Sequence, residues 1–573
     1  MNSKDDAGRG VSCTVTGICQ KRIRLELTLR VTKDGKPWEG EGADALQFYV
    51  VETNSRKRVG VFESVASEGS KRVLTFLITN RGDNACLDPG TYGIAVCNSD
   101  DIYIADAVTA DGISIGSEDE PVGPNNGLTL KYPYRKGCYY KVTIKPELTK
   151  GQPLVIEVRD FNGKKDLRRF VSDRKKDLIR CWYQLQKGAN AKGRKNSILF
   201  LRLHEGLTAD NLNAVRDRMI ARDMEKLWQI HQASINPAGR KKSFRDDLQM
   251  AANLAKNRIV VIDEHVPMLD WLDPGEDFSL IQLWHAGVGF KATGYSRWGC
   301  KGAVSPMSSH RRITYATVSS VKVRDIFSEL WGIAGEQIIP CGIPRMDRFL
   351  DQEAAAETKK RLLDIYPACR DRRVMLFAPT YRGRGYKDAH YPYDRIDLRA
   401  MHDLAEKKGW ILLFKMHPWI KQKPLVPDEC KDLIIDVGNE QIEDLFQITD
   451  LLITDYSSAL FEFSLMQKPM LFYAFDEEDY AKDRGFHRPY RENAPGKVVT
   501  DFDGLLAAIE AEDFESEKVA EYVGNHFDTV DTNACDRVID WLIEGHLPDE
   551  YRKALDAHEA YVQSWKGKRM LTN

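Results

Sequence analysis

The sequence contains no apolar run of the roughly 18 residues that a membrane-spanning helix needs. The segment Met1–Gly10 also lacks the apolar core of a signal peptide. None of the 11 cysteines forms a Cys-x-x-Cys pair, which favours reduced thiols over a disulfide framework or a zinc site. Lys and Arg (83) nearly balance Asp and Glu (85), so a net charge of −2 gives no overall reason to expect nucleic-acid binding. These absences predict a cytoplasmic protein.

The chain has 573 residues of ordinary globular composition, which predicts roughly three to four domains. Residues 1–160 have the pattern of an all-β domain. Polar and apolar residues alternate from Arg22 to Val31, which is typical of a strand with one wet face, and Asp34-Gly35 forms a turn after it. Further short apolar runs separated by turn residues predict an accessory β-sandwich, immunoglobulin-like in plan, without a catalytic pattern.

Residues 161–195 are basic and polar. They contain Lys164-Lys165, Arg168-Arg169 and Arg174-Lys175-Lys176. We interpret them as a helical linker and loop. Two interpretations of the charge stay open, a solvated face or a cationic surface that contacts anionic lipid headgroups.

From Ser197 onward, apolar strands alternate with amphipathic helices. One series occupies residues 196–345 and a second occupies residues 346–545. Each predicts a parallel sheet covered by helices on both faces. The expected fold class is therefore α/β, a GT-B-type pair of doubly wound Rossmann-like domains after the β-sandwich. Residues 546–573 are expected to form a C-terminal helix and tail that pack back across the domains.

The stretch Asp455-Tyr456-Ser457-Ser458 follows the apolar run Leu451–Thr454 and precedes a helical run. An ordinary helix N-cap is one interpretation, because Asp and Ser are common there. The other is an anion site, because a helix start at the carboxyl end of a parallel strand attracts phosphate. The remaining motifs favour the second, since each follows a predicted strand or joins the two series.

Two histidines take similar places in the two series. His285 follows one strand within Trp284-His285-Ala286-Gly287, and His417 follows another within Lys415-Met416-His417-Pro418. Imidazole titrates near neutral pH and therefore suits general-base work. Lys415 and His417 share one side of an extended segment, where they can neutralise a diphosphate. For His285 the alternative is a structural ring that is hydrogen-bonded to backbone, and for the second motif it is a strand-end His417 beside a solvated Lys415.

Three further sets complete the candidate cleft. Thr380 and Arg382 follow the first strand of the second series, where Arg382 can fork onto phosphate oxygens or be an ordinary surface side chain. Arg345 and Asp347 lie between the series and predict a cross-cleft contact or a structural ion pair. Glu462 lies four residues after Ser458 on the same helix face, where it can bind ribose hydroxyls or face solvent.

These motifs, in this order, resemble the CDP-glycerol:poly(glycerophosphate) glycerophosphotransferase family, the teichoic-acid primases and polymerases. The resemblance spans residues 195–545 and rests on five segments, Trp284–Gly287, Gly342–Asp347, Pro379–Arg382, Lys415–Pro418 and Asp455–Ser458. Ala286-Gly287-Val288-Gly289 departs from the Gly-Thr-Pro that commonly follows the His in this family. The acceptor and the polyol are therefore left open.

The resemblance implies His285 as the base that deprotonates the acceptor hydroxyl, and His417 as a contact of the donor diphosphate. It assigns charge stabilisation to Arg382, Lys415, Ser457 and Ser458, and ribose binding to Glu462. Asp455 is expected to orient the Ser-Ser turn. No Asp-x-Asp pair lies near these motifs, so we expect no obligate protein-bound metal or cofactor, while Mg²⁺ carried on the donor is left open.

The resemblance implies a transferase that moves a polyol phosphate, glycerol phosphate first, from a CDP-polyol to a hydroxyl of a lipid-linked teichoic-acid-like or capsular polymer, releasing CMP. The alternative is a GT-B glycosyltransferase with a nucleotide-sugar donor. The expected partners are CDP-glycerol or another CDP-polyol, the lipid-linked acceptor and the inner face of the cell membrane, bound peripherally. Self-association is left open.

Overall fold

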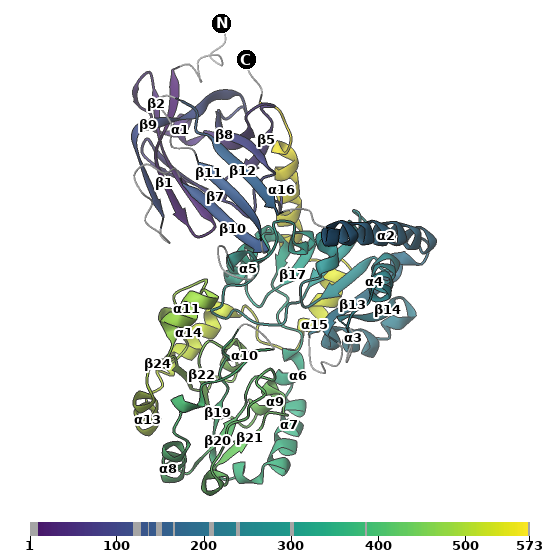
Figure 1. Ribbon diagram of the computed structural model, residues 1–573, viewed down its shortest axis with the longest axis vertical. Coiled ribbons are helices and arrows are strands. Elements are labelled where there is room, and N and C mark those ends of the chain that lie inside the picture. Colours follow the sequence, from purple (N-terminus) through teal and green to yellow (C-terminus); the bar gives the residue numbers. More distant parts are fainter. Residues whose placement is uncertain are drawn as a thin grey trace.

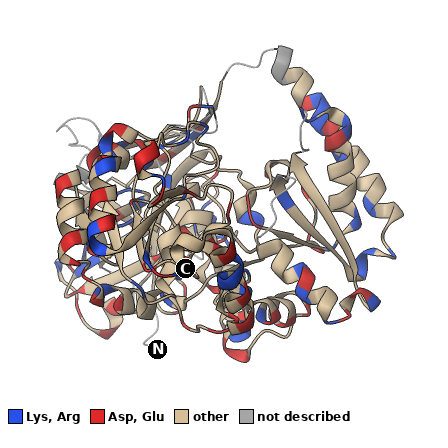
Figure 2. Cartoon of the chain, turned by 90° about the horizontal axis from the view of Figure 1, so that it is seen from below, with Lys and Arg blue, Asp and Glu red and all other residues tan. Residues whose placement is uncertain are grey.

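The computed structural model describes residues 10–117, 128–135, 137–144, 152–163, 167–204, 211–236, 241–297, 303–383 and 387–570. A group of strands lies at one end, and two parallel sheets with their helices follow (Figure 1). The predicted mixed α/β fold with parallel sheets is confirmed. Basic and acidic side chains are interspersed over the chain (Figure 2), and their totals nearly balance.

The N-terminal region contains one sheet of twelve strands and a single short helix among its described residues, α1 (Glu41–Asp44). The strands are β1 (Val11–Lys21), β2 (Arg24–Lys33), β3 (Lys36–Pro37), β4 (Gln47–Glu52), β5 (Arg58–Val61), β6 (Ser64–Glu68), β7 (Lys71–Leu77), β8 (Gly90–Cys97), β9 (Tyr103–Ser117), β10 (Thr129–Arg135), β11 (Cys138–Ile144) and β12 (Ile156–Asn162). The alternation predicted between Arg22 and Val31 is present in β2, where Leu25, Leu27 and Leu29 are buried. Described strand pairs are antiparallel except β1 with β9.

The first parallel sheet has the strand order β14-β13-β15-β16-β17-β18. Its strands are β13 (Ser197–His204), β14 (Gln229–Asn236), β15 (Ile259–Ile262), β16 (Ser279–Gln282), β17 (Tyr315–Thr317) and β18 (Ile338–Ile339). Its helices are α2 (Leu167–Ala189), α3 (Asn211–Ala221), α4 (Phe244–Lys256) and α5 (Arg324–Trp331). We call this unit the first half. A capping box at Ser243 starts α4.

Helix α2 belongs to the first half and is more than a linker. Its residues Ile179 and Tyr183 are buried in the same apolar cluster as Leu199 and Leu254. The helix covers most of the stretch predicted as a basic linker, while residues 164–166, with Lys164 and Lys165, lie outside the described residues.

The second parallel sheet has the strand order β21-β20-β19-β22-β23-β24. Its strands are β19 (Arg373–Phe377), β20 (Trp410–Phe414), β21 (Ile434–Asp436), β22 (Leu451–Thr454), β23 (Met470–Tyr473) and β24 (Lys497–Val499). The helices of this second half are α6 (Met346–Leu350), α7 (Gln352–Ile365), α8 (Leu398–Lys408), α9 (Ile442–Leu445), α10 (Ala459–Ser464), α11 (Glu477–Arg484), α12 (Tyr490–Asn493), α13 (Phe502–Ala511) and α14 (Glu517–His526). Its strand order reverses between β19 and β22, the switch point where such sheets bind ligands.

The end of the chain returns to the first half and then to the N-terminal region (Figure 1). Helix α15 (Ala534–Arg537) and the π-helical turn Val538–Ile543 pack against β13 and α3 of the first half. The stretch 346–545, expected as one domain, therefore divides its contacts between both halves. Helix α16 (Asp549–Trp565) runs on to the strands and buries Trp565 beside Val61. The Met570 N–H then donates to Arg56 O at 3.0 Å.

The turn between β1 and β2 connects the N-terminal region to both halves. Arg22 donates to Ser296 O and to His487 O, each at 3.1 Å, and forms an ion pair with Glu329 of α5 at 2.7 Å. Arg24 pairs with the other oxygen of Glu329 at 2.6 Å. No helix among the described residues is long and apolar enough to span a membrane.

Candidate active site

Four loops that follow parallel strands meet at a cavity of about 280 Å³ between the two halves. The loop after β16 brings His285, and the loops after β19, β20 and β22 bring Thr380, His417 and the Ser457-Ser458 pair. An adjoining cavity of about 250 Å³ shares His285, His417 and both serines and adds Lys415 and Glu462. The structure therefore brings both imidazoles to the same space as the hydroxyl-bearing turn.

His285 is held through one ring nitrogen. Its Nδ1 lies 3.0 Å from Asp263 O and 3.2 Å from Glu264 Oε1, and its side chain is 44% exposed. Both neighbours are acceptors, which assigns the proton of the neutral ring to Nδ1. Nε2 is then the nitrogen that can accept a proton, as a general base requires.

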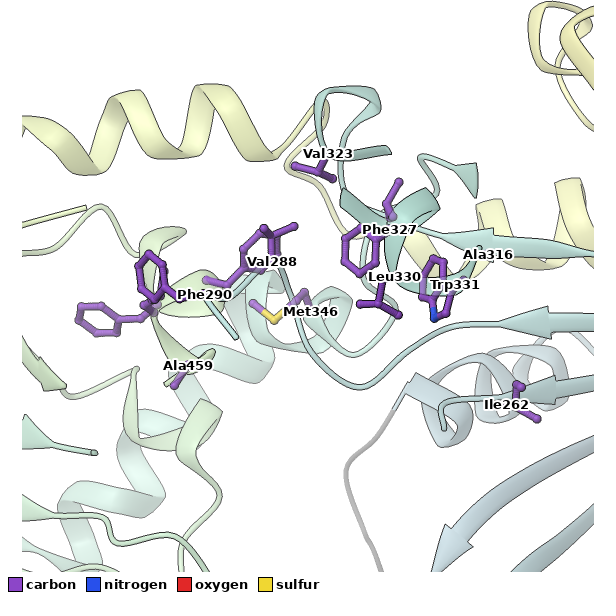
Figure 3. Packing of buried hydrophobic residues seen from close by; sticks show 14 of the residues in the cluster. Ile262, Val288, Phe290, Ala316, Val323, Phe327, Leu330, Trp331, Met346 and Ala459 are labelled. Atoms are coloured by element: carbon purple, nitrogen blue, oxygen red, sulfur yellow. The ribbon is translucent and has the colours of Figure 1, made fainter. Parts of the chain in front are cut away.

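The loop that carries His285 is anchored on the second half. Figure 3 shows Val288 and Phe290 of this loop projecting toward the second half. Val288 O accepts from the Tyr522 hydroxyl at 3.1 Å, and the rings of Phe290 and Tyr490 are 4.7 Å apart at an angle of 76°. A Cβ on Gly287 would overlap the Phe461 ring, so this close approach requires glycine. The segment that departs from the family pattern is therefore packed between the halves.

His417 takes the opposite tautomer. Its Nδ1 accepts from the Trp419 N–H at 3.2 Å, so the neutral ring carries its proton on Nε2. Burial, reinforced by Lys291 and Lys415, lowers the pKa of His417 to about 4. At neutral pH the ring is therefore an uncharged hydrogen-bond donor, and Tyr381 packs on it with ring centroids 4.7 Å apart.

Asp455 and Arg382 form a buried network behind the cavity. Asp455 Oδ1 accepts from the Thr380 N–H at 2.7 Å and the Tyr456 N–H at 2.6 Å, and its Oδ2 lies 2.9 Å from Arg382 Nη1. The other side of Arg382 binds Asp476 in a fork, at 2.6 and 2.8 Å. Asp455 thus holds the backbone at Thr380 and at Tyr456, next to the serine pair. Arg382 donates to the two carboxylates and to Thr380 O, and it does not line the cavity.

The serine turn presents hydroxyls without a long helix behind it. Ser457 Oγ accepts from the Ala459 N–H at 3.3 Å, and Ser458 is the N-cap of α10 without a side-chain cap. The helix has only six residues, so its dipole contributes little. Thr380 Oγ1 is buried at the cavity with no hydrogen-bond partner among the described residues.

Arg345 and Asp347 do not pair with each other. Arg345 forms an ion pair with Glu462 and donates to His285 O at 2.8 Å, which is the predicted cross-cleft contact. Asp347 accepts from the backbone N–H groups of Ala534 and Cys535, at 2.9 and 2.7 Å, and so caps α15.

Lys415 and Glu462 lie at the adjoining cavity. Lys415 Nζ donates to Gly438 O at 2.8 Å, and burial lowers its pKa. Burial raises the pKa of Glu462 against the attraction of Arg345. Glu462, the carboxylate expected to bind the ribose, is therefore already paired with Arg345, which lies at the edge of the first half.

Two basic residues that line the cavity escaped the sequence analysis. Lys291 lies six positions after His285, and the His487 Nε2–H donates to Gly289 O at 2.6 Å. Neither belongs to a motif at a strand end, so no local pattern points to them. The described residues contain no group of three or more His, Cys, Asp or Glu side chains that could hold a metal ion.

The model of the CDP-glycerol:poly(glycerophosphate) glycerophosphotransferase family matches residues 184–544. The chain belongs to this family. The matched region contains every residue placed at the two cavities, and the resemblance expected from the motifs is confirmed.

Curated relatives agree. The teichoic acid ribitol-phosphate polymerase TarL of Staphylococcus aureus is 34% identical over 360 residues, covering 62% of this chain and 63% of the relative. The teichoic acid poly(ribitol-phosphate) polymerase of Bacillus spizizenii is 37% identical over 306 residues, covering 53% of this chain and 49% of the relative. The chain thus spans about half to two thirds of these relatives. The solved wall teichoic acid polymerase TagF shares the fold, with a TM-score of 0.51 at 21% identity over 68% of this chain and 97% of that chain.

Proposed function

We propose that this protein transfers a polyol phosphate from a CDP-polyol to a hydroxyl of a teichoic-acid-like polymer and releases CMP. Family membership supports the reaction class. The observation that carries the proposal is the shared cavity, which His285 from the first half and His417 from the second half line together with Ser457 and Ser458. Phosphoryl transfer asks a protein mainly for positioning and charge stabilisation, which these groups supply.

In the proposed reaction, His285 Nε2 accepts the proton of the acceptor hydroxyl as its oxygen attacks the β-phosphorus of the donor. A new O–P bond forms, the bond from phosphorus to the bridging oxygen breaks, and that oxygen leaves with CMP. Asp263 O and Glu264 face Nδ1, so the imidazolium keeps its orientation and its charge is stabilised. His417 Nε2–H donates to the phosphate oxygens.

In this proposal, the cytidine of the donor binds in the adjoining cavity of about 250 Å³. Glu462 lies there for the ribose hydroxyls and Lys415 for negative charge. Arg382 acts one layer behind, as a positioning residue, because it binds Asp455, which in turn holds the backbone of Thr380 and Tyr456.

The polyol is tested by measuring CMP release from CDP-glycerol and CDP-ribitol with short phosphopolyol acceptors. Glycerol phosphate is the group that we expect first. Ribitol phosphate is the second candidate, because the names of TarL and the Bacillus spizizenii polymerase contain it. UDP-sugars are the matched third donor, since a GT-B glycosyltransferase releases a nucleoside diphosphate instead of CMP. Sugar transfer with UDP release and no turnover of either CDP-polyol would overturn the proposal.

We also propose that the two halves form a GT-B-type pair and that the N-terminal strands form an accessory sandwich for the polymer acceptor. The shared cavity supports the first, since GT-B clefts lie between two such halves. The Arg22 contacts support the second, because they join this region to the cavity-lining residues Ser296 and His487.

Helix α2 supports a peripheral position at the inner face of the cell membrane, where lipid-linked polymers are extended. Its side chains Phe170, Leu178 and Leu185 are 56%, 60% and 67% exposed, and Arg174 and Lys176 lie among them on the same helix. Exposed apolar residues beside cations are the pattern of interfacial helices.

Sedimentation with phosphatidylglycerol vesicles at low salt tests this position. Leu178→Glu with Leu185→Glu should release most of the protein from the vesicles. Ile365→Glu, at a 49% exposed apolar residue of α7, is the matched control and should leave vesicle binding unchanged. Equal binding of the α2 double variant and the unmodified protein would exclude α2 as the contact.

A further inference from the structure

Arg382 and Lys415, the two cations that the motifs predict for donor binding, already donate to other groups of the protein. Arg382 divides its donors between Asp455, Asp476 and Thr380 O. The Lys415 ammonium lies 2.8 Å from Gly438 O at the adjoining cavity. A diphosphate in the 280 Å³ cavity would therefore need positive charge from another residue.

Lys291 provides that charge. It lines the cavity together with Thr380, His417 and the serine turn, and it is half-buried. Within the described part of the chain, no acceptor is hydrogen-bonded or ion-paired to its ammonium. An ammonium without a partner in a partly dry cleft is costly, and an anionic ligand removes that cost.

The loop fixes this lysine against the second half. Lys291 forms an isolated antiparallel bridge with Phe486, and the next residue, Ala292, donates to Gly485 O at 2.9 Å. Its backbone is thus bound to the segment after α11 although it belongs to the loop after β16. Lys291 lines the cavity, and its charge acts on the His417 ring across it.

The groups around Lys291 complete an anion site. His417 presents Nε2–H, and Thr380 Oγ1 is buried without a partner among the described residues. Asp455 attracts the ammonium, while Arg382 and Arg484 repel it. Burial and these two guanidinium groups lower the pKa of Lys291 to about 8, so the charged form still predominates at neutral pH.

We propose that Lys291 is a catalytic residue that binds the diphosphate of the CDP-polyol from the opposite half of the cleft. The inference rests on the proposed function and adds a residue that the motifs do not include. Lys291 and His285 share one loop, so a phosphate held by Lys291 also sets the distance from the base to the β-phosphorus. The ammonium stabilises the charge that develops on the bridging oxygen as CMP leaves.

Calorimetric titration with CDP-glycerol and CDP-ribitol tests the proposal. Lys291→Met should weaken binding of the donor that the protein uses by roughly tenfold or more and lower kcat by about a hundredfold. Lys291→Arg should recover part of both. Lys482→Met, at an exposed lysine of α11, is the matched control and should change neither. Binding and kcat within twofold of the unmodified protein in Lys291→Met would overturn the proposal.

Acetylation of lysines at pH 8, followed by mass spectrometry, tests the site in the unmodified protein. CDP-glycerol and, separately, sodium pyrophosphate should slow acetylation of Lys291 several-fold and leave Lys482 unchanged. Pyrophosphate contains no nucleoside or polyol, so its protection stands even if the protein uses another donor. Absence of protection by both probes overturns the inference. Protection by pyrophosphate without CMP release from any CDP-polyol overturns the proposed function alone.

Discussion

The two halves present different environments to the cavity that they share. At the end of β22 in the second half, Asp455 is bonded to two backbone N–H groups and to Arg382, which is bonded in turn to Asp476. At the end of β16 in the first half, His285 is 44% exposed and Lys291 has no acceptor among the described residues.

This difference indicates a division of tasks. The second half presents a donor site whose geometry is set by buried ion pairs before any ligand arrives. The first half contributes the base His285 and the cation Lys291 on one loop. Contacts of Val288, Phe290 and the Lys291 backbone with the second half position this loop. The reactive groups of the first half thus depend on the other half for their placement.

The largest effect is expected at His285. His285→Ala should lower kcat about a thousandfold, because no other group at that position accepts the proton of the acceptor hydroxyl. Binding of CDP-glycerol, measured by calorimetry, should change less than twofold, since the proposed donor contacts of the second half and of Lys291 remain in place. His265→Ala, whose ring pairs with Asp270, is the control. Near-normal turnover in His285→Ala would remove the proposed base.

Arg382→Ala should have the largest effect on stability. It leaves Asp455 and Asp476 without their buried counter-ion, which should lower the free energy of unfolding by about 3–5 kcal/mol. Urea unfolding followed by fluorescence measures the loss. Arg373→Ala, which removes an exposed pair with Glu512, should cost less than about 1 kcal/mol. Similar losses in both variants would contradict a pre-built donor site.

Gly287→Ala should separate the two tasks. The added methyl group would overlap the Phe461 ring, so the loop must shift away from the second half. We expect kcat to fall roughly tenfold, as misplacement of a reacting group does. Donor affinity should fall less, because the donor contacts of the second half are unchanged and only Lys291 moves with the loop. Gly335→Ala is the matched control, because its Cβ would meet no atom within 4 Å. A loss of donor affinity without a loss of kcat would reverse the assignment.

The smallest effect is expected from acid. Burial lowers the pKa of His417, His487 and His526 in the second half to about 4, and that of His310 in the first half to about 3. In the unfolded chain each ring takes up a proton below its ordinary pKa of 6.5, whereas in the folded chain it stays neutral down to about pH 4. The contribution of these rings to the free energy of unfolding is therefore fully present above pH 6.5 and is lost as the pH falls toward 4. Hydrogen exchange at pH 7.5 and pH 5 should show a larger loss of protection in the second half. A larger loss in the first half would contradict the prediction.

The periodicity of the chain predicted the fold from local cues. A strand buries every second side chain, and a helix buries every third or fourth. The alternation in Arg22–Val31 and the repeated strand–helix pattern after Ser197 were therefore visible in the sequence. The return of Ala534 and its neighbours to the first half was not predictable in this way, because that packing depends on residues more than 300 positions away, such as Phe200.

The candidate site was predictable where a motif coincides with a strand end. His285, His417, Thr380 and Ser457 all line the cavity because the carboxyl ends of parallel strands face it. Arg382 has the right place in the sequence, but its side chain points to Asp476, a choice that local sequence does not record. Lys291 lies in a loop without periodicity, and the backbone bridge to Phe486, which places this loop at the cavity, joins residues far apart in the sequence.

The return of the chain to its first strands sets an order of events. β5 of the N-terminal region pairs with β4 along one edge, but its other edge acquires a partner only when the segment around Met570 arrives. The side chains of Arg58 and Met570 that meet there are 512 positions apart. During synthesis, this strand leaves the ribosome long before the segment that covers its edge. Until then the edge is open to other chains, so a truncation that removes α16 and the residues after it should aggregate, even though it removes no residue of the cavity.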